Sequence, residues 1–270
     1  MPKIGFSTSC LSDIDLLEQI EFANENNIKA IEIFADSPES WPGDLTRNNW
    51  RKTRKNLNKY DIEPSIHAPI YGTNIGSLNT GIAEETMRQI RLSIDLAVYL
   101  GGSVVVIHGG RIRSSKYDSK SKALKRCEQN IASVANYANK RGAILCLENI
   151  GAYPKKDIPA NVYEQKNLIE VIDNPALKCT LDNGHANAWE NMEKAFNVLG
   201  DYIRHIHLAD NFGCEDDHLP IGKGNIDFSS ISNFLSEFKY QISLEITDKK
   251  NPKKGVLESI INVKEIINLS

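Results

Sequence analysis

The sequence predicts an α/β protein, a (β/α)8 or TIM barrel folded as a single domain over residues 1–270. Short β-branched runs alternate with longer segments of helical periodicity, and eight such pairs follow one another. No Pro-, Gly- or Ser-rich linker or shift of composition interrupts the series. Eight uninterrupted units favour one closed barrel over two open sheets.

The elements are expected in strict alternation. Strands are expected at residues 3–8, 30–35, 63–68, 103–108, 143–148, 177–182, 202–208 and 240–246. Helices are expected at residues 13–26, 47–59, 82–100, 119–141, 164–173, 190–199, 228–237 and 255–268. Boundary signals support these ranges: Ser12-Asp13 before the first helix, and Gly101-Gly102, Gly142 and Gly200 after the third, fourth and sixth.

A doubly wound sheet is the main alternative fold. It would carry a glycine-rich turn after the first strand, and residues 5–12 contain no such turn. Gly222 and Gly224 form a late I-G-K-G turn, which is a weak signal for phosphate binding and equally typical of an ordinary turn.

The composition limits which binding partners and which cellular compartment are expected. The net charge of -3 and the pI near 6.1 give no basic field for a polyanion, so a nucleic-acid partner is not expected although a local cluster remains an option. The chain has no signal-like N-terminus and no apolar run of about 18 residues, so we expect no membrane partner. The five cysteines are Cys10, Cys127, Cys146, Cys179 and Cys214. They indicate neither a disulfide framework nor a C-x-x-C zinc site, and the lack of a disulfide pattern favours a reducing cytoplasm.

Nine residues able to bind a metal lie at or just after the ends of the expected strands. The strand ends of a (β/α)8 barrel share one rim, so these side chains should converge on one pocket. The nine are His67, His108, Glu148, Asp182, His185, His207, Asp216, His218 and Glu245.

The histidines end strand-like runs. His67 ends S-I-H-A-P, where Pro69 stops further pairing, and His108 ends V-V-V-I-H-G-G. Such a histidine alone is often a hydrogen-bonded structural residue, but the two matching positions favour metal binding. His205 and His207 share one face of Y-I-R-H-I-H-L; His207, nearer the rim, is the expected ligand, and His205 is expected in the core or behind the ligands.

Two acids end apolar runs. Glu148 closes A-I-L-C-L-E and Glu245 closes S-L-E. An unpaired carboxylate there would cost several kcal/mol to desolvate. A basic partner is the ordinary solution, yet the one nearby, Arg204, stands at the start of its strand, so a metal is the more economical partner.

The remaining donors lie on turns. Asp182 and His185 are three residues apart across a turn bent by Gly184, which would let both reach one ion, although D-N-G is also an ordinary turn sequence. Asp216 and His218 share a short loop, for which a solvated acidic turn is the alternative.

The donor types indicate the metal. Imidazole with carboxylate and without thiolate suits zinc, manganese, cobalt or iron. Nine ligands exceed the capacity of one ion, so two or three ions about 3.5 to 4 Å apart are expected at full occupancy. The expected cofactor is therefore one to three divalent ions, zinc or manganese.

At these motifs the chain resembles the xylose-isomerase-like barrels, a superfamily that includes ketose 3-epimerases and endonuclease IV, over nearly its whole length. The motifs are H-A-P at 67–69, V-I-H-G-G at 106–110, L-E-N at 147–149, L-D-N-G-H-A at 181–186, H-I-H-L-A-D at 205–210, D-D-H-L-P-I-G-K-G-N-I-D-F at 216–228 and L-E-I at 244–246. The resemblance implies a four-ligand core of Glu148, Asp182, His207 and Glu245. The endonuclease IV pattern adds ligands for a trinuclear zinc site, and they match His67, His108, His185, Asp216 and His218.

The sequence differs from both ketose 3-epimerases and endonuclease IV at residues that contact the substrate in those enzymes. The substrate-holding glutamate and arginine of ketose 3-epimerases are replaced by Pro154 and Gly213. The loop at residues 35–44 lacks the basic and glutamine residues with which the nuclease enters DNA, and Ile70 stands where the nuclease has a tyrosine.

Two reaction classes remain, and we expect the first because the substrate-contacting loops look unlike those of a nuclease. In a metal-dependent isomerase or epimerase of a sugar or sugar phosphate, Glu148 and Glu245 would exchange a proton as acid and base, and His185 would position a substrate oxygen. Lys223 or Arg111 would be available for a phosphate, although each also fits a solvated surface. The alternative is a zinc phosphodiesterase acting on abasic DNA; a non-catalytic sugar- or metal-binding barrel is the third class.

Overall fold

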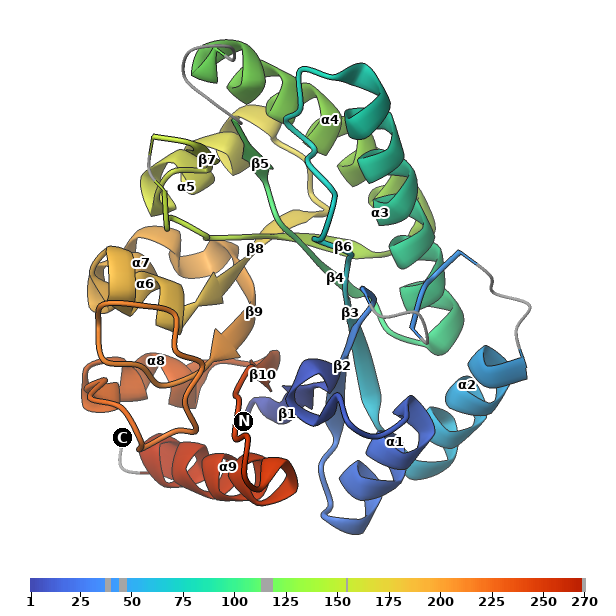
Figure 1. Ribbon diagram of the computed structural model, residues 1–270, viewed down its shortest axis with the longest axis vertical. Helices are drawn as coiled ribbons and strands as arrows, with labels where there is room; N and C mark the ends of the chain where they lie inside the picture. Colours follow the sequence, from blue (N-terminus) through green and yellow to red (C-terminus); the bar gives the residue numbers. More distant parts are fainter. Residues whose placement is uncertain (37–39, 44–47, 113–118, 154, 269–270) are drawn as a thin grey trace.

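The fold is a closed barrel of parallel strands surrounded by helices (Figure 1). The computed structural model describes residues 1–270 except 37–39, 44–47, 113–118, 154 and 269–270. Around the barrel the strands follow the order β1-β10-β9-β8-β6-β4-β3-β2. They are β1 (Lys3–Ser7), β2 (Ala30–Phe34), β3 (Glu63–His67), β4 (Val104–Ile107), β6 (Ile144–Glu148), β8 (Leu177–Asp182), β9 (Ile203–Leu208) and β10 (Gln241–Leu244). The predicted (β/α)8 barrel is confirmed, and each predicted strand agrees with the observed bounds to within two residues.

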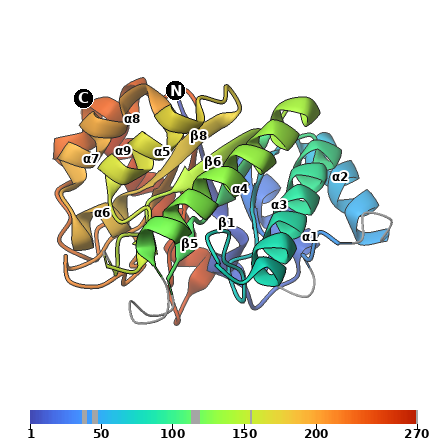
Figure 2. The ribbon, with the colours of Figure 1, turned by 90° about the horizontal axis from the view of Figure 1, so that it is seen from above.

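The helices form the outer layer, as the side view in Figure 2 shows. They are α1 (Leu16–Glu25), α2 (Asn48–Tyr60), α3 (Thr80–Leu100), α4 (Lys120–Arg141), α5 (Val162–Ile172), α6 (Asn183–Trp189), α7 (Met192–Leu199), α8 (Ser232–Glu237) and α9 (Pro252–Asn268). Gly101 and Gly142 end α3 and α4 with φ values of 92° and 73°, a left-handed conformation that suits glycine, as the sequence predicted. Within the described part of the chain, no helix is both long and apolar enough to cross a membrane.

The first helix begins later than predicted. A 3₁₀ turn, η1 (Thr8–Leu11), follows β1, and the side chain of Asp15, rather than Ser12 or Asp13, caps α1 by accepting from the Glu18 N–H at 2.9 Å. The predicted helix at 228–237 is also divided, into a 3₁₀ turn, η3 (Phe228–Ile231), and α8. Short polar segments at helix starts favour such turns, because Ser and Asp side chains bond to nearby backbone N–H groups.

One small sheet was not predicted. The strands β5 (Gly110–Arg111) and β7 (Asp157–Ile158) pair antiparallel beyond the ends of β4 and β6. Gly109 permits this ribbon, because a Cβ at that position would collide with the carbonyl of Ile158. The ribbon joins the segments that follow β4 and β6.

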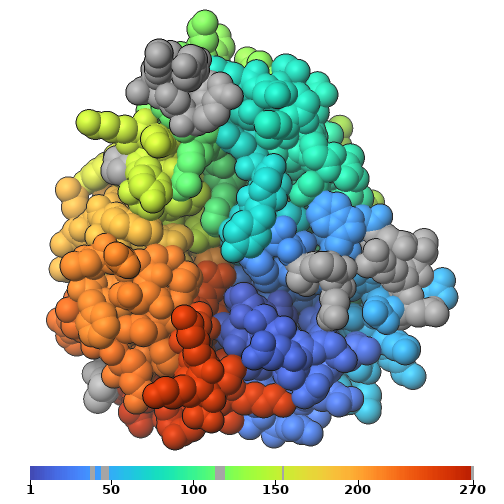
Figure 3. Space-filling model, viewed as in Figure 1, coloured from blue at the N-terminus to red at the C-terminus, as the bar shows by residue number. Residues whose placement is uncertain are grey.

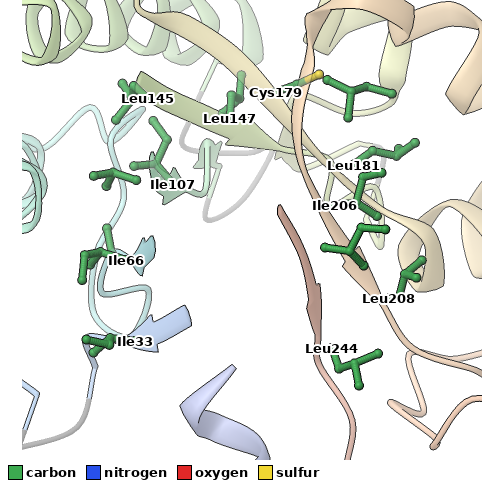
Figure 4. Close-up of a cluster of buried hydrophobic side chains, with 14 of the residues drawn as sticks. Ile33, Ile66, Ile107, Leu145, Leu147, Cys179, Leu181, Ile206, Leu208 and Leu244 are labelled. Atoms are coloured by element: carbon green, nitrogen blue, oxygen red, sulfur yellow. The ribbon is translucent and has the colours of Figure 1, made fainter. Parts of the chain in front are cut away.

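The strands separate an apolar outer layer from a polar interior. Their outward side chains belong to one buried hydrophobic core, and those labelled in Figure 4 are Ile33, Ile66, Ile107, Leu145, Leu147, Cys179, Leu181, Ile206, Leu208 and Leu244. The alternate positions face the barrel axis, where side chains meet across non-adjacent strands: the Gln241 amide on β10 donates to Ser65 Oγ on β3 at 3.0 Å. Glu32, His205 and His207 belong to this interior set. Because the polar residues occupy the inner face, the barrel can hold ionised groups without disturbing its outer core.

Candidate metal centre

A cavity of about 410 Å³ lies at the carboxyl ends of the strands. Figure 2 shows that the N-terminus, where β1 begins, lies on the side of the molecule that is distant in Figure 1. Figures 1 and 3 are therefore viewed from the side of the carboxyl ends of the strands. Seven of the nine predicted donors line the cavity, namely His67, His108, Glu148, His185, Asp216, His218 and Glu245. Asp182 and His207 lie just beneath them and are 1% and 0% exposed. The structure thus brings all nine residues to one place.

Four donors meet at the centre of this place. The ring atom His207 Nδ1 lies 3.5 Å from Glu148 Oε1, 3.8 Å from Asp182 Oδ2 and 3.4 Å from Glu245 Oε2. One ligand atom from each of the four side chains lies within 4.8 Å of all the others. Glu148, Asp182 and His207 are supplied by β6, β8 and β9, and Glu245 directly follows β10. This spacing permits all four to bind one ion.

A second group shares Glu148 with the first. His67, the last residue of β3, and His108, directly after β4, place their Nε2 atoms 3.2 and 3.1 Å from Glu148 Oε2. These three residues also satisfy the spacing for a common ion. The two oxygens of Glu148 therefore face different groups of donors.

A third arrangement is built around Asp216. Its Oδ2 atom lies 3.1 Å from His185 Nε2 and 2.8 Å from His218 Nε2. His218 has φ of 49°, an uncommon value for a non-glycine residue, and its Nδ1 is 2.6 Å from the carbonyl oxygen of Glu245. Asp216 is thus held between two imidazoles rather than forming the solvated acidic turn that was the alternative.

Asp210 shapes the loop that carries Asp216 and His218. Its buried carboxylate accepts backbone N–H bonds from Gly222 at 2.9 Å, Gly224 at 2.8 Å and Ile226 at 3.2 Å. The I-G-K-G turn therefore binds a carboxylate of its own chain, and the ordinary-turn interpretation of these glycines is the correct one.

The predicted turn after β8 is in fact the start of α6. The Asp182 side chain caps this helix, with Oδ1 accepting the N–H of His185 at 2.7 Å. His185 Nδ1 lies 2.7 Å from the carbonyl oxygen of Asn149, and its ring stacks on Trp189 with centroids 5.2 Å apart. Residues three apart reach the same site because a helix cap, not a bend at Gly184, brings them together.

Burial and opposite charges shift the pKa values of the imidazoles. Burial lowers the pKa of His67, but the hydrogen bond and charge of Glu148 outweigh it and raise the pKa to about 9. Burial also lowers the pKa of His185, but Asp182 and Asp216 outweigh it and raise the pKa to about 10. At His218, Asp216 outweighs the effect of burial in the same way and raises the pKa to about 9. These three rings therefore favour the positively charged form beside the buried carboxylates, whereas burial lowers the pKa of His108.

The carboxylates respond in opposite directions. Burial would raise the pKa of Glu148, but His108 and His207 hold it well below its usual range. Burial prevails at Glu245 and raises its pKa to about 7, against the opposing charge of His207. Two acids of one cluster therefore differ in their tendency to hold a proton.

Unpartnered buried atoms show that the site fits a cation. Asp182 Oδ2 and His207 Nδ1 are buried and without a hydrogen-bond partner among the described residues, and both point into the four-donor group. Leaving such atoms unpaired costs about 1 to 3 kcal/mol each. All the donors are oxygen or nitrogen, which suits zinc or manganese.

Glu32 was not among the predicted site residues. It lies in the middle of β2, is 0% exposed, and its Oε2 atom is 2.7 Å from His205 Nε2 and 3.1 Å from His207 Nε2. The signal was present, because A-I-E-I-F holds a lone acid inside an apolar run, as at Glu148. Glu32 lies in mid-strand, however, whereas the predicted ligands lie at or after strand ends. His205 lies beneath His207, as expected of a residue behind the ligands.

The residues considered for a phosphate lie outside the cavity. Arg111 Nε is bonded to the buried carboxylate of Asp157 at 2.5 Å, and Lys223 is exposed on the loop after Pro220. Gly213 is described and has φ of 81°, whereas Pro154 and part of the loop at 35–44 lie outside the described residues. Ile70 lines the cavity beside Tyr71.

The sequence profile described as xylose isomerase-like TIM barrel matches residues 20–266. The chain belongs to this family. The uncharacterized protein MJ1614 of Methanocaldococcus jannaschii is 30% identical over 98% of this chain and 99% of its own length. Fructoselysine 3-epimerase of Shigella flexneri is 24% identical (88% and 87% covered), and a probable endonuclease 4 of Halothermothrix orenii is 24% identical (82% and 84% covered).

Solved structures agree with the family assignment. A D-tagatose 3-epimerase-like protein superimposes with a TM-score of 0.84 and 26% identity, covering 98% of each chain. The IolI protein, solved with a binding zinc atom, has a TM-score of 0.82 and 16% identity with 98% of each chain covered, which supports the fold alone. Both branches predicted from the motifs are therefore represented among the relatives.

Proposed function

We propose that the protein is a divalent-metal-dependent isomerase or epimerase that moves a proton on a sugar or sugar phosphate. We further propose that the nine converging residues hold one to three ions, zinc or manganese, with Glu148, Asp182, His207 and Glu245 as the innermost ligands. The observation that carries the proposal is the placement of Glu148 and Glu245 about one point, each within 3.5 Å of His207 Nδ1.

The two glutamates are suited to opposite roles in proton transfer. The pKa of Glu148 is depressed by His108 and His207, although burial opposes this, so it is ionised and able to accept a proton. The pKa of Glu245 is raised to about 7 by burial, so it can hold and release a proton near neutral pH. A divalent ion, when bound, would supply the Lewis acidity that makes the substrate proton easier to remove.

His185 would position the substrate. It lines the cavity, its Nδ1 is fixed on the Asn149 carbonyl oxygen, and Trp189 stacks on its ring. The opening beyond the glutamates is lined by Ser9, Tyr71 and Thr247, which offer hydroxyl groups to a polyol. The similarity to a D-tagatose 3-epimerase-like protein and to fructoselysine 3-epimerase supports a carbohydrate substrate.

Isotope exchange tests this proposal. The protein, loaded with manganese or zinc, is incubated with ketoses, aldoses and their phosphates in deuterated water, and deuterium beside the carbonyl carbon is followed by NMR. We expect exchange with at least one substrate, abolished in Glu245→Gln and retained in Glu190→Gln, a half-buried carboxylate outside the cavity. No exchange with any substrate by the metal-loaded protein would exclude the isomerase reaction for that panel.

A second function is favoured by one specific observation. His67 and His108 on one side, and Asp216 between His185 and His218 on the other, extend the four-donor group to the complete set associated with a trinuclear zinc phosphodiesterase. Nicking of a duplex with an abasic site, absent in Glu148→Gln, would support this function and contradict the first. Metal analysis adds an independent measure, since one ion per chain supports the sugar reaction and three zinc ions support the nuclease.

A further inference from the structure

Glu32 and His205 form a buried pair beneath the candidate metal ligands. Both side chains are 0% exposed, and they come from β2 and β9, strands that are not neighbours in the barrel. Oε2 of Glu32 accepts a hydrogen bond from His207 Nε2 at 3.1 Å and lies 2.7 Å from His205 Nε2. The carboxylate therefore lies between the two imidazoles, on the side of His207 away from the cavity.

His207 is oriented differently from three other candidate imidazoles. His67, His185 and His218 each place Nδ1 within 2.9 Å of a backbone carbonyl oxygen and turn Nε2 toward a carboxylate of the site. His207 is reversed, because its Nε2 faces Glu32 and its Nδ1 faces Glu148, Asp182 and Glu245. An ionised carboxylate thus replaces the neutral carbonyl that supports the other rings.

We propose that Glu32 is a positioning residue that sets the ring plane and the tautomer of His207, and that His205 holds Glu32 in place. A proton on Nε2, donated to Glu32, leaves the Nδ1 lone pair free to face the four-donor group. A carboxylate behind a ligand imidazole also makes the ring a stronger donor, and loss of such a partner commonly weakens metal binding by about 10- to 100-fold. This inference rests on the metal site of the proposed function.

The same three residues could instead be regarded as a metal site of their own, since their donor atoms lie within 4.8 Å of one another. Two features argue against this. Both Nε2 atoms lie within 3.1 Å of one oxygen, and none of the three side chains lines the cavity through which an ion would enter. A hydrogen-bonded support satisfies the geometry without an additional ion.

Three variants separate a positioning role from a general structural one. Glu32→Gln keeps the size and an acceptor oxygen but removes the charge, and His205→Asn removes the contact that holds Glu32. Asp157→Asn is the matched control, because Asp157 is also a 0% exposed carboxylate but pairs with Arg111 outside the site. Zinc affinity of each chelator-stripped protein is measured by competition with a chromophoric chelator, beside its thermal melt.

We expect Glu32→Gln to bind zinc about 10- to 100-fold more weakly than the wild type, His205→Asn to show a smaller loss, and Asp157→Asn to match the wild type. Equal affinity of Glu32→Gln and the wild type would overturn the inference while leaving the proposed metal site intact. Failure of the wild-type protein to bind zinc would instead contradict the proposed function itself.

A measurement on the wild type covers the case in which Glu32→Gln does not fold. NMR of isotopically labelled histidine in the cadmium-loaded protein reports which ring nitrogen binds the metal and which carries hydrogen. We expect one imidazole bound through Nδ1 with its Nε2 protonated. Coordination of every metal-bound imidazole through Nε2 would refute the orientation on which the role of Glu32 depends.

Discussion

The buried imidazoles predict an unusual pH dependence for the metal-free protein. Burial alone would lower the pKa of His67, yet Glu148 raises it from 6.5 to about 9. The folded state therefore binds a proton that the unfolded chain releases between these values. Because the folded pKa is the higher one, the stabilisation is fully present below pH 6.5 and is lost as the pH rises through 9.

The size of the effect follows from the shift of this one group. A change of pKa from 6.5 to about 9 at a fully buried ring corresponds to about 3 kcal/mol of unfolding free energy. His185 and His218 shift in the same direction, but they share carboxylates with one another, so their contributions do not add. For a chain of this length, about 3 kcal/mol corresponds to a fall in Tm of roughly 6 to 12 °C.

The assay compares thermal melts of chelator-treated and zinc-loaded protein at pH 6.5 and pH 9. The metal-free Tm should fall between these values, whereas the stabilisation by zinc should grow, because zinc binds only deprotonated imidazole. The variant His67→Gln should show a smaller fall in Tm without metal. A metal-free Tm that is constant or higher at pH 9 would refute the assignment of buried imidazolium groups.

Three other predictions concern the loops and the shared carboxylate. Asp210→Asn should lower the unfolding free energy by about 2 to 4 kcal/mol, measured by urea unfolding, because an amide nitrogen would face backbone N–H donors; an unchanged midpoint would contradict this role. Glu148→Gln should reduce the number of ions per chain, counted by atomic emission after gel filtration, since both groups of donors lose a ligand; a wild-type count would argue against sharing. Gly109→Ala should lower Tm, because its methyl group would overlap the Ile158 carbonyl, and Gly81→Ala, where a Cβ makes only an ordinary contact with the Asn79 side chain, is the steric control.

Much of the fold was predictable because the hydrophobic periodicity and the residues at element boundaries indicate the same strands and helices. The strand ranges follow from β-branched runs, and Gly101 and Gly142 mark helix ends where a left-handed residue is required. The β5–β7 ribbon was not predictable in the same way. It contains two residues on each side, and its pairing depends on a close approach at Gly109 that only the folded chain creates.

The site was predictable to the extent that the barrel geometry determines it. Donors at strand ends converge on one rim, so His67 and Glu148 could be placed together although 81 residues separate them. Glu32 was not predicted because it lies in the middle of β2, below the rim. The capping role of Asp182 was not predicted because the sequence D-N-G is compatible with both a turn and the start of a helix. The sequence indicates which side chains meet, whereas their hydrogen-bond partners behind the rim depend on packing.

The two oxygens of Glu148 face separate donor groups, so at the proposed metal centre the binding of one ion would affect the binding of the next. An ion held by the donors around His207 and Glu245 would reduce the negative charge that Glu148 offers to an ion beside His67 and His108. By thermodynamic reciprocity, an ion bound first beside His67 and His108 would weaken binding at the inner four-donor group by the same factor. Stepwise filling would follow from this shared carboxylate, and the ambient metal concentration would then decide how many ions each barrel carries.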